Sequence, residues 1–282
     1  MKKIILTVVL IITAISLFAQ ISNEIKLDEA KYKCTYLLTY QPDSTDIELI
    51  KQEEMILFIG DKISEFISSG LYKQDSLKSV FIKNMNNPEY KNPDSLSAKK
   101  MFGMDLPHTH FNEHIFKNYP KGKITVTEDI LLDNFKYVDS VGLFNWVIKN
   151  NTKKIGNYIC READCYFAGR NYTAWFTDEI PLSEGPYKFS GLPGLIIVLY
   201  DENNQYKYEL LSMKKLSELV NIEISDDKYI NTNKHEFFRL KEEFNKNAFD
   251  RMEDAGIFFG NPVTNKEKQK IIIKMNNNSV EL

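Results

Sequence analysis

The chain of 282 residues carries 36 Lys and Arg against 39 Asp and Glu, a net charge of -3, which argues against nucleic acid as a partner because a nucleic-acid-binding face needs a cationic excess. Apolar residues make up 43% of the chain, with only 12 Gly and 9 Pro, so disordered, collagenous and low-complexity chains are excluded. Aromatic residues, at 12%, favour β-rich packing.

The first predicted element is an export signal. Lys2 and Lys3 precede an uncharged, mostly apolar run over residues 4–19, and a polar stretch follows it. This run is shorter than the roughly 20 apolar residues of a membrane-spanning helix, and its layout is typical of a secretory signal peptide. An uncleaved anchor is the alternative. We predict cleavage after Ala19, a periplasmic or secreted mature protein, and no membrane span after cleavage.

Apolar segments that alternate with period 2, or run on for several residues, recur with short breaks along the remaining chain. This pattern is typical of an antiparallel sheet. The predicted strands cover residues 32–40, 55–59, 63–67, 115–119, 124–127, 135–138, 144–148, 158–167, 172–176, 195–200 and 206–211.

Two helices are predicted. The first covers residues 76–85, with Asp75 as its N-cap. The second covers residues 234–252, with Asn233 as N-cap and Glu236 three residues later, and its apolar residues fall on one face.

The domain organisation follows from these elements. Residues 20–282 are expected to form a single domain with a polar surface insertion over residues 86–107. The stretch over residues 261–282 is either a last edge strand or a loose end. The predicted fold class is α+β, mainly β, with a curved antiparallel sheet of half-barrel or bowl-like shape and about two helices.

The chain holds three cysteines, Cys34, Cys160 and Cys165, and an odd number leaves at least one thiol unpaired in a monomer. Within one continuous strand, Cys160 and Cys165 would lie about 16 Å apart. A disulfide needs Cα atoms within about 7 Å, so these two can pair only if the residues between them turn. Buried or free thiols without a redox role are the alternative.

The most distinctive stretch is the hexapeptide Gly191-Leu192-Pro193-Gly194-Leu195-Ile196. Proline fixes φ near -65° and glycine can take positive φ, so Pro193 and Gly194 suit the two central positions of a type II turn. A buried strand should follow at once. The glycines match neither of two phosphate-binding patterns, G-x-x-x-x-G-K-[ST] and a G-x-G-x-x-G that opens a helix. We therefore interpret the hexapeptide as a rigid turn that sets strand register.

The hexapeptide, with Ala-Gly-Arg-Asn-Tyr-Thr-Ala-Trp-Phe-Thr at residues 168–177 and Gly-Pro at residues 185–186, resembles the GLPGLI family of exported Bacteroidetes proteins. Residues 119–126 and the closing Ser-Val-Glu-Leu at 279–282 extend the similarity over most of the mature chain. The resemblance implies an exported β-rich domain and no established activity. A fainter similarity to the bowl-like N-terminal β domain of some secreted peptide:N-glycosidases implies an accessory or binding role, without the glycosidase chemistry.

Three of the four histidines, His108, His110 and His114, lie within one short stretch. On a helix, His110 and His114 would share a face and could hold zinc, with Glu113 as the base of an H-x-x-E-H motif. The following hairpin signal and the family resemblance favour a strand instead. In a strand, residues four apart are separated by about 13 Å, so only His108 and His110 could share a metal. We expect these histidines to lie at the surface or to have ordinary hydrogen-bond partners.

Three residues around the hexapeptide are candidate ligand contacts. Arg170 could bind a carboxylate, although an ion pair with an acid on the neighbouring strand is the simpler expectation. Trp175 and Tyr187 could line a carbohydrate or lipid cleft, although aromatic residues of a β domain usually belong to its core.

No catalytic residue and no cofactor is assigned from the sequence. The hypothesis is a non-catalytic binding or assembly module of the cell envelope. Its concave sheet face would take an apolar ligand, a glycan or another envelope protein. The alternatives are a zinc-dependent hydrolase that uses the H-x-x-E-H motif and a periplasmic lipid or lipoprotein carrier.

Overall fold

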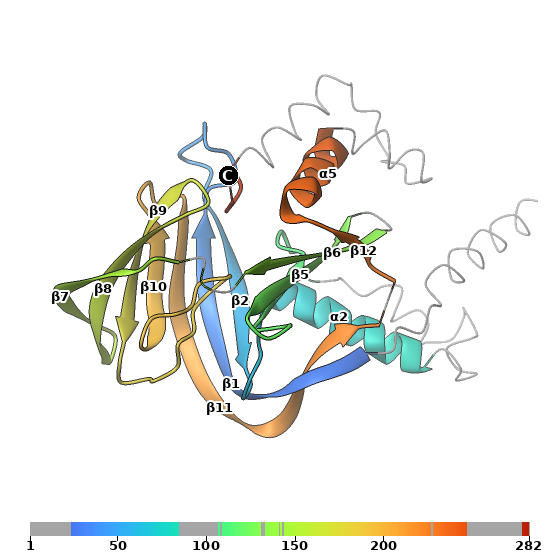
Figure 1. The fold of residues 1–282 in the computed structure, drawn as a ribbon, viewed down its shortest axis with the longest axis horizontal. Coiled ribbons are helices and arrows are strands. Elements are labelled where there is room, and N and C mark those ends of the chain that lie inside the picture. The colour runs from blue at the N-terminus through green and yellow to red at the C-terminus, as the bar shows by residue number, and fades with distance from the viewer. Residues whose placement is uncertain are drawn as a thin grey trace, which may run out of the picture.

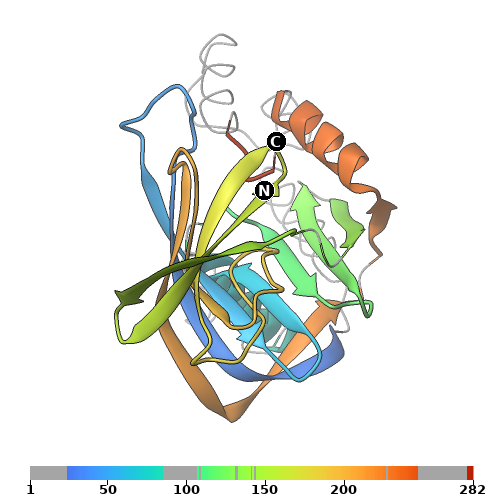
Figure 2. The ribbon, with the colours of Figure 1, turned by 60° about the vertical axis from the view of Figure 1, so that its left-hand side comes forward.

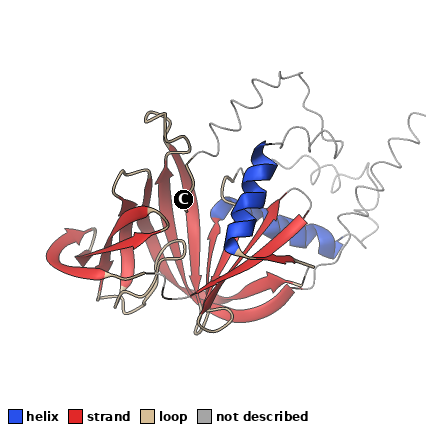
Figure 3. Cartoon of the chain, turned by 45° about the horizontal axis from the view of Figure 1, so that its top comes forward, coloured by secondary structure: helices blue, strands red, loops and turns tan. Residues whose placement is uncertain are grey.

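The fold is known from a computed structural model, which describes residues 24–84, 107, 109–130, 133–140, 142, 144–226, 228–246 and 278–281. The predicted signal peptide and nearly all of the predicted insertion over residues 86–107 lie outside these residues. In the described part of the chain, strands dominate and two helices accompany them (Figures 1 and 3).

The elements follow in chain order. They are β1 (Glu24–Tyr40), β2 (Lys51–Ile59), β3 (Ser64–Ser68), α2 (Ser69–Asn84), β4 (Glu113–Lys117), β5 (Lys123–Ile130), β6 (Asp133–Ser140), β7 (Val147–Ile155), β8 (Tyr158–Phe167), β9 (Arg170–Thr177), β10 (Leu195–Asp201), β11 (Tyr206–Ser225), β12 (Ile230–Thr232) and α5 (Lys234–Lys246).

All strands of the described residues belong to one 12-stranded sheet in the order β12-β6-β5-β4-β3-β2-β1-β11-β10-β9-β8-β7. Every neighbouring pair is antiparallel except β12 and β6, which run parallel. The sheet curves strongly but stays open, because β12 and β7 form its two edges (Figure 2). The predicted fold class, a curved antiparallel sheet with two helices, is confirmed.

The longest strands, β1 and β11, form the bent middle of the sheet (Figure 1). Their pairing carries register shifts, among them one between Ala30 and Tyr32. Such bulges bend a strand and increase its twist, so these shifts help to curve the sheet. The prediction ended the last long strand at residue 211, whereas β11 continues to Ser225. That extension has no buried residue before Ile222, and its pairing with β1 makes it a strand.

Side-chain alternation gives the sheet two buried faces. On one face, residues from opposite walls of the sheet meet, and Tyr36 Oη donates to the carbonyl of Ile196, 2.7 Å away on the non-neighbouring strand β10. This is the concave face. On the other, convex face, Phe58 and Ile67 pack with Leu71 of α2. α2 therefore covers the outside of the bowl, and the main core fills its inside.

Both helices were predicted, but the first begins earlier than expected. Its N-cap is Ser68, whose Oγ accepts from the amide of Gly70 at 3.0 Å, and not Asp75. The second begins as predicted, because Asn233 Oδ1 accepts from the amide of Glu236 at 2.9 Å. Its predicted end at residue 252 lies outside the described residues. Neither described helix combines the length and apolar character needed to cross a lipid bilayer.

Every predicted strand overlaps an observed one, with one substantial shift. The strand predicted over residues 144–148 begins only at Val147. Phe144 and Trp146 leave the sheet to pack on Phe189, with a centroid distance of 4.6 Å for the Phe144 and Phe189 rings. β12 was missed because it is short, and its partner is the distant strand β6.

The hexapeptide forms a turn, but not the predicted type II turn. Positive φ occurs at Gly191, at 96°, and not at Gly194. Gly194 is needed for another reason, because a Cβ there would overlap the carbonyl oxygen of Thr177 and lie 2.6 Å from its carbonyl carbon. Leu195 then pairs with Thr177 to begin the buried strand β10, as predicted.

All three cysteines are buried and unbonded. Cys160 and Cys165 lie in the single strand β8, so the geometric condition for a disulfide between them is not met. Burial raises the pKa of Cys34 to about 12 and that of Cys160 to about 11, which disfavours the reactive thiolate.

Candidate functional site on the concave face

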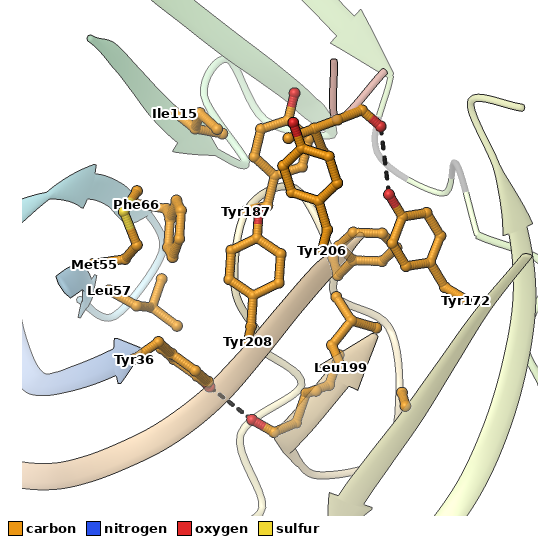
Figure 4. Packing of buried hydrophobic residues seen from close by; sticks show 14 of the residues in the cluster. Tyr36, Met55, Leu57, Phe66, Ile115, Tyr172, Tyr187, Leu199, Tyr206 and Tyr208 are labelled. Carbon is orange, nitrogen blue, oxygen red and sulfur yellow. Dashed lines mark hydrogen bonds between the residues drawn. The ribbon is translucent and has the colours of Figure 1, made fainter. Parts of the chain in front are cut away.

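Two irregular segments fill the concave face. The first covers residues 178–194, between β9 and β10, and places Tyr187 and Phe189 in the main core. Lys117 of β4 holds it, since Nζ donates to the carbonyl of Gly185 at 2.8 Å and pairs with Glu184 at 2.5 Å. The second covers residues 278–281. Figure 4 shows the tyrosines that converge between the walls of the sheet.

Residues 278–281 are held from several directions although they belong to no helix or strand. Asn278, Val280 and Glu281 are each 5% exposed. Buried main-chain carbonyls and carboxylates need hydrogen-bond partners, and side chains of the surrounding elements supply them here.

The first residue of this segment is bound through both its side chain and its main chain. Arg170 Nη2 donates to Asn278 Oδ1 at 2.5 Å and to the carbonyl of Ser279 at 3.0 Å. Tyr206 Oη donates to the carbonyl of Asn278 at 2.5 Å. Asn278 Nδ2 in turn donates to the carbonyl of Gln41 at 2.6 Å. The asparagine amide is therefore bonded at both ends.

The remaining main-chain contact comes from β9. Tyr172 Oη donates to the carbonyl of Val280 at 3.3 Å, and the Val280 side chain belongs to the main core (Figure 4). Burial raises the pKa of Tyr172 far above its ordinary range, so its hydroxyl stays protonated and remains a donor.

The last residue of the segment carries a charge that two lysines bind. Glu281 Oε1 lies 2.5 Å from Lys188 Nζ and accepts from Tyr187 Oη at 2.6 Å. Its other oxygen pairs with Lys234 of α5. Lys188 is fully buried and also lies 3.3 Å from Asp139 on β6. Burial raises the pKa of Glu281, but the two ammonium groups outweigh it and lower the pKa below 4.5.

We call these side chains the segment clamp. Its members are Arg170, Tyr172, Tyr187, Lys188, Tyr206 and Lys234. They come from β9, from the segment over residues 178–194, from β11 and from α5. The clamp thus joins one wall of the bowl to α5 and β6 on the other side, with residues 278–281 as the connecting piece.

The three candidate contacts from the sequence have different places. Arg170 pairs at 3.1 Å with Asp201 of the neighbouring strand β10, as the simpler expectation had it, and also belongs to the clamp. Tyr187 is buried in the clamp. Trp175 is buried beneath Lys153 of β7, whose Nζ lies 3.8 Å from the ring centroid.

Sequence reasoning missed Lys188, Lys234, Tyr172 and Tyr206. A signal did exist for Lys188, because it is the one charged residue in the run from Gly185 to Ile196, where Tyr187 and Phe189 flank it. A lysine that must be buried needs an anionic partner, but nothing in the local pattern points to Glu281.

The histidines do not form the helix that the H-x-x-E-H motif requires. His108 lies outside the described residues, and His110 lies in an irregular stretch where its ring stacks on Tyr40 at 5.3 Å. His114 lies in strand β4, which Glu113 begins. Among the described residues, no group of three or more His, Cys, Asp or Glu is placed to hold a metal ion.

His114 faces the convex side and joins the sheet to α2. Its Nδ1 lies 2.9 Å from Glu65 Oε1, and its Nε2 lies 3.2 Å from Asp75 Oδ2. Burial disfavours the charged ring, but the bonds to Asp75 and Glu65 outweigh it and raise the pKa of His114 to about 10. The ring is therefore a cation that fastens α2 at neutral pH.

A second unusual group on the concave face is the carboxyl of Glu113. Glu113 lies directly opposite Glu128 in the β4 and β5 ladder. Lys241 of α5 pairs with Glu128 at 2.7 Å. Burial raises the pKa of Glu113 to about 7, with a further increase from Glu128 and a decrease from Lys241. Like charges opposite each other in a sheet are destabilising, so ionised Glu113 opposes folding.

We expect Glu113→Gln to stabilise the protein at high pH only. The pKa of Glu113 is about 7 in the folded state against an ordinary 4.5, so the unfolded chain loses this proton at lower pH and stability falls between these values. The variant should exceed wild type by about 2 kcal/mol in free energy of unfolding at pH 8, and by much less at pH 4.5. Urea unfolding at both pH values measures this difference.

The matched control for that measurement is Glu128→Gln, on the opposite strand. This substitution removes the charge opposite Glu113 but also the ion pair with Lys241, so at pH 8 it should stabilise the protein by less than Glu113→Gln does. An equal gain from Glu113→Gln at both pH values would show that the carboxyl charge is not the cause.

Comparison with known proteins adds one family match. The model of a family described as a protein of unknown function (Porph_ging) matches residues 168–198. This stretch contains four clamp residues, Arg170, Tyr172, Tyr187 and Lys188, and the whole hexapeptide. No curated protein matches the chain.

Two solved structures of PNGF-II are similar in fold. The structure in space group P21 has 13% sequence identity and a TM-score of 0.48, and the similarity covers 76% of this chain and 33% of that chain. The structure in space group C2 has 15% identity and a TM-score of 0.45, with 73% and 31% covered. The chain therefore spans about a third of the length of these neighbours.

Proposed function

We propose that this protein is an exported module of the cell envelope that binds a short polypeptide segment on its concave face, without catalysis. The observation that carries the proposal is the segment clamp. Its side chains bind three consecutive main-chain carbonyls and one carboxylate of residues 278–281. Main-chain carbonyls occur in every peptide, so donors placed in this way recognise a backbone and the carboxylate adds selectivity.

The chemistry of the clamp favours a polypeptide over an apolar ligand. The clamp presents a guanidinium, two ammonium groups and three phenolic hydroxyls to its occupant. An apolar ligand would remove the hydrogen bonds that the three hydroxyls make to residues 278–281, at a cost of about 1 to 3 kcal/mol for each. It would also remove the carboxylate that Lys188 and Lys234 share. A peptide with an acidic side chain satisfies these groups.

Export is proposed from the sequence. Lys2 and Lys3 with the apolar run over residues 4–19 support a secretory signal, and cleavage after Ala19 would deliver the mature chain to the periplasm or beyond. In that location the occupant would be a segment of another envelope protein.

Binding of a synthetic hexapeptide tests the proposal. The probe is fluorescein-labelled Asn-Asn-Ser-Val-Glu-Leu, which repeats residues 277–282. The protein is the full chain with Asn278→Ala and Glu281→Gln, which weaken its own segment and leave the clamp intact. We expect saturable binding by fluorescence anisotropy. No saturation up to about 1 mM peptide, where binding is worth only about 4 kcal/mol, would overturn the proposal.

Two conservative variants show whether the clamp is the binding site. Added to this chain, Tyr206→Phe removes one donor to the segment and should raise the dissociation constant about 3- to 10-fold. Tyr208→Phe is the control, since it deletes the same atom from the same strand, whereas the tyrosine hydrogen bonds to residues 278–281 come from Tyr172, Tyr187 and Tyr206. Equal affinities for the two chains would show that the peptide binds elsewhere.

A further inference from the structure

Residues 278–281 occupy the very site that the proposed function assigns to a partner, and this inference rests on that function. We propose that these residues are an internal pseudo-ligand that limits access to the segment clamp. We further propose that the partner displacing them is a peptide with Asn and, three residues later, Glu. The proposal stands on the contacts of Asn278 and Glu281 and on the charges around them.

The requirement for Glu follows from the charge balance at one end of the clamp. Lys188 is fully buried and Lys234 is 34% exposed, and both lie on the Glu281 carboxylate. Asp139 is the other anion there, 3.3 Å from Lys188 and 3.5 Å from Lys234. Without a carboxylate from the occupant, Asp139 would be the one described carboxylate paired with these two cations, and Lys188 is fully removed from water. Buried unpaired charge is strongly unfavourable, so the site selects an acidic occupant.

The requirement for Asn follows from the other end. Arg170 donates to Asn278 Oδ1, and Asn278 Nδ2 donates to the carbonyl of Gln41. A carboxylate at this position would present a second acceptor to the Gln41 carbonyl, and an aliphatic side chain would leave the Arg170 donor and the Gln41 acceptor unpaired. Only a side chain with a donor and an acceptor in amide geometry satisfies both.

The residues between these two ends carry less selectivity. The carbonyls of Ser279 and Val280 accept from Arg170 and Tyr172, and such bonds are available to any residue. The Ser279 side chain is only partly buried, whereas Val280 is 5% exposed and packs in the main core. The peptide class is therefore Asn-x-x-Glu, with a medium-sized apolar residue before Glu.

The limited access to the segment clamp would result from competition within the chain. The pseudo-ligand belongs to the same chain as the clamp, so it competes intramolecularly, at an effective concentration on the order of millimolar. A partner at micromolar concentration must bind much more tightly, or the internal segment must be weakened, before the site becomes available. Wild type should accordingly bind the free peptide far less well than a chain with a weakened segment.

The test compares full-length wild type with the Glu281→Gln chain. The probes are the labelled peptide Asn-Asn-Ser-Val-Glu-Leu and its analogue Asn-Asn-Ser-Val-Gln-Leu. We expect Glu281→Gln to bind the Glu peptide at least about 10-fold more tightly than wild type does. The same variant should prefer the Glu peptide over the Gln peptide by about 10-fold or more.

Lys234→Gln, added to Glu281→Gln, identifies the source of that preference. Lys234 is partly exposed, so its replacement leaves the core unchanged, and the preference for the Glu peptide should fall at least about 3-fold. Lys241→Gln is the control, because Lys241 lies on the same helix and pairs with Glu128. If Glu281→Gln does not fold, Asn278→Ala weakens the segment without changing a charge and should also bind the Glu peptide more tightly than wild type.

The outcomes separate this inference from the proposed function. Equal binding of the Glu and Gln peptides overturns the acidic specificity, and equal affinity of wild type and the weakened chains overturns the pseudo-ligand. In both cases a peptide still binds, and the proposed function stands. If no chain binds either peptide, the proposed function fails and this inference fails with it.

Discussion

Replacing Gly194 with alanine is expected to lower the free energy of unfolding by more than about 4 kcal/mol, or to prevent folding. The added Cβ would overlap the carbonyl oxygen of Thr177 and lie 3.1 Å from the Cα of Asp178. Both neighbours are main-chain atoms, which cannot move aside as the end of a flexible side chain would. Relief therefore requires β9 and β10 to separate where Leu195 pairs with Thr177. Urea unfolding followed by circular dichroism measures the loss.

The other glycine of the hexapeptide supplies the matched control. A Cβ at Gly191 would come no nearer than 3.9 Å to the Trp146 ring, so that substitution meets only the strain of φ at 96°. We expect Gly191→Ala to lose about 1 to 3 kcal/mol. If Gly194→Ala lost no more than Gly191→Ala, the close approach to Thr177 would not be what requires glycine in the hexapeptide.

Arg170→Met is expected to lower the free energy of unfolding by about 3 to 5 kcal/mol. Arg170 is 4% exposed and Asp201, its partner at 3.1 Å, is fully buried. The guanidinium also donates to Gln205 at 2.6 Å and to residues 278–281. Methionine fills a similar volume but leaves the Asp201 carboxylate without its cation. Urea unfolding at pH 7 measures the loss, and peptide binding should weaken in parallel.

A double substitution tests whether the lower free energy of unfolding comes from the unpaired Asp201 carboxylate or from lost packing. Asp201→Asn keeps an acceptor for the amide of Tyr206, which lies 2.6 Å from Oδ1, and removes the charge. The loss of stability in the double variant, Arg170→Met with Asp201→Asn, should therefore be about 2 kcal/mol smaller than the sum of the two single losses. Strict additivity would mean that the ion pair is not the reason for the loss.

The segment clamp links stability and binding in one set of side chains. Residues 278–281 join β9 and β11 to the region of β6 and α5 across the open side of the sheet. Displacing them would remove a connection between the two walls unless another peptide with the same contacts took their place. Under the proposed function, an acidic partner would restore the buried ion pairs that it disrupts.

Much of the fold could be predicted because its signals are local. The strand over residues 158–167 was predicted with the bounds of β8, and the N-cap Asn233 was identified from its spacing to Glu236. Period-2 alternation reflects one buried face of a strand, and a cap reflects bonds within one turn. Both are encoded within a few neighbouring residues.

The errors arise where the deciding contact is distant in sequence. The prediction of a type II turn with positive φ at Gly194 was wrong, because glycine is required there by the nearby carbonyl of Thr177, on another strand, and not by its φ angle. α2 begins early because Ser68 ends a strand and caps the helix at once. The extension of β11 exists because β1 continues beside it.

The amino-acid sequence alone determined a mainly β chain with two helices and the positions of nearly all strands along it, and it singled out Arg170 and Tyr187 as candidate ligand contacts. Only the tertiary structure decided that these two residues meet on residues 278–281, and that Lys188, Lys234 and Glu281 share one buried charge cluster. The physical reason is the separation along the sequence over which each kind of interaction acts. Periodicity and capping act between residues a few positions apart, whereas Arg170 and Asn278 are brought together by a curved sheet whose strands are drawn from residues 24 to 232.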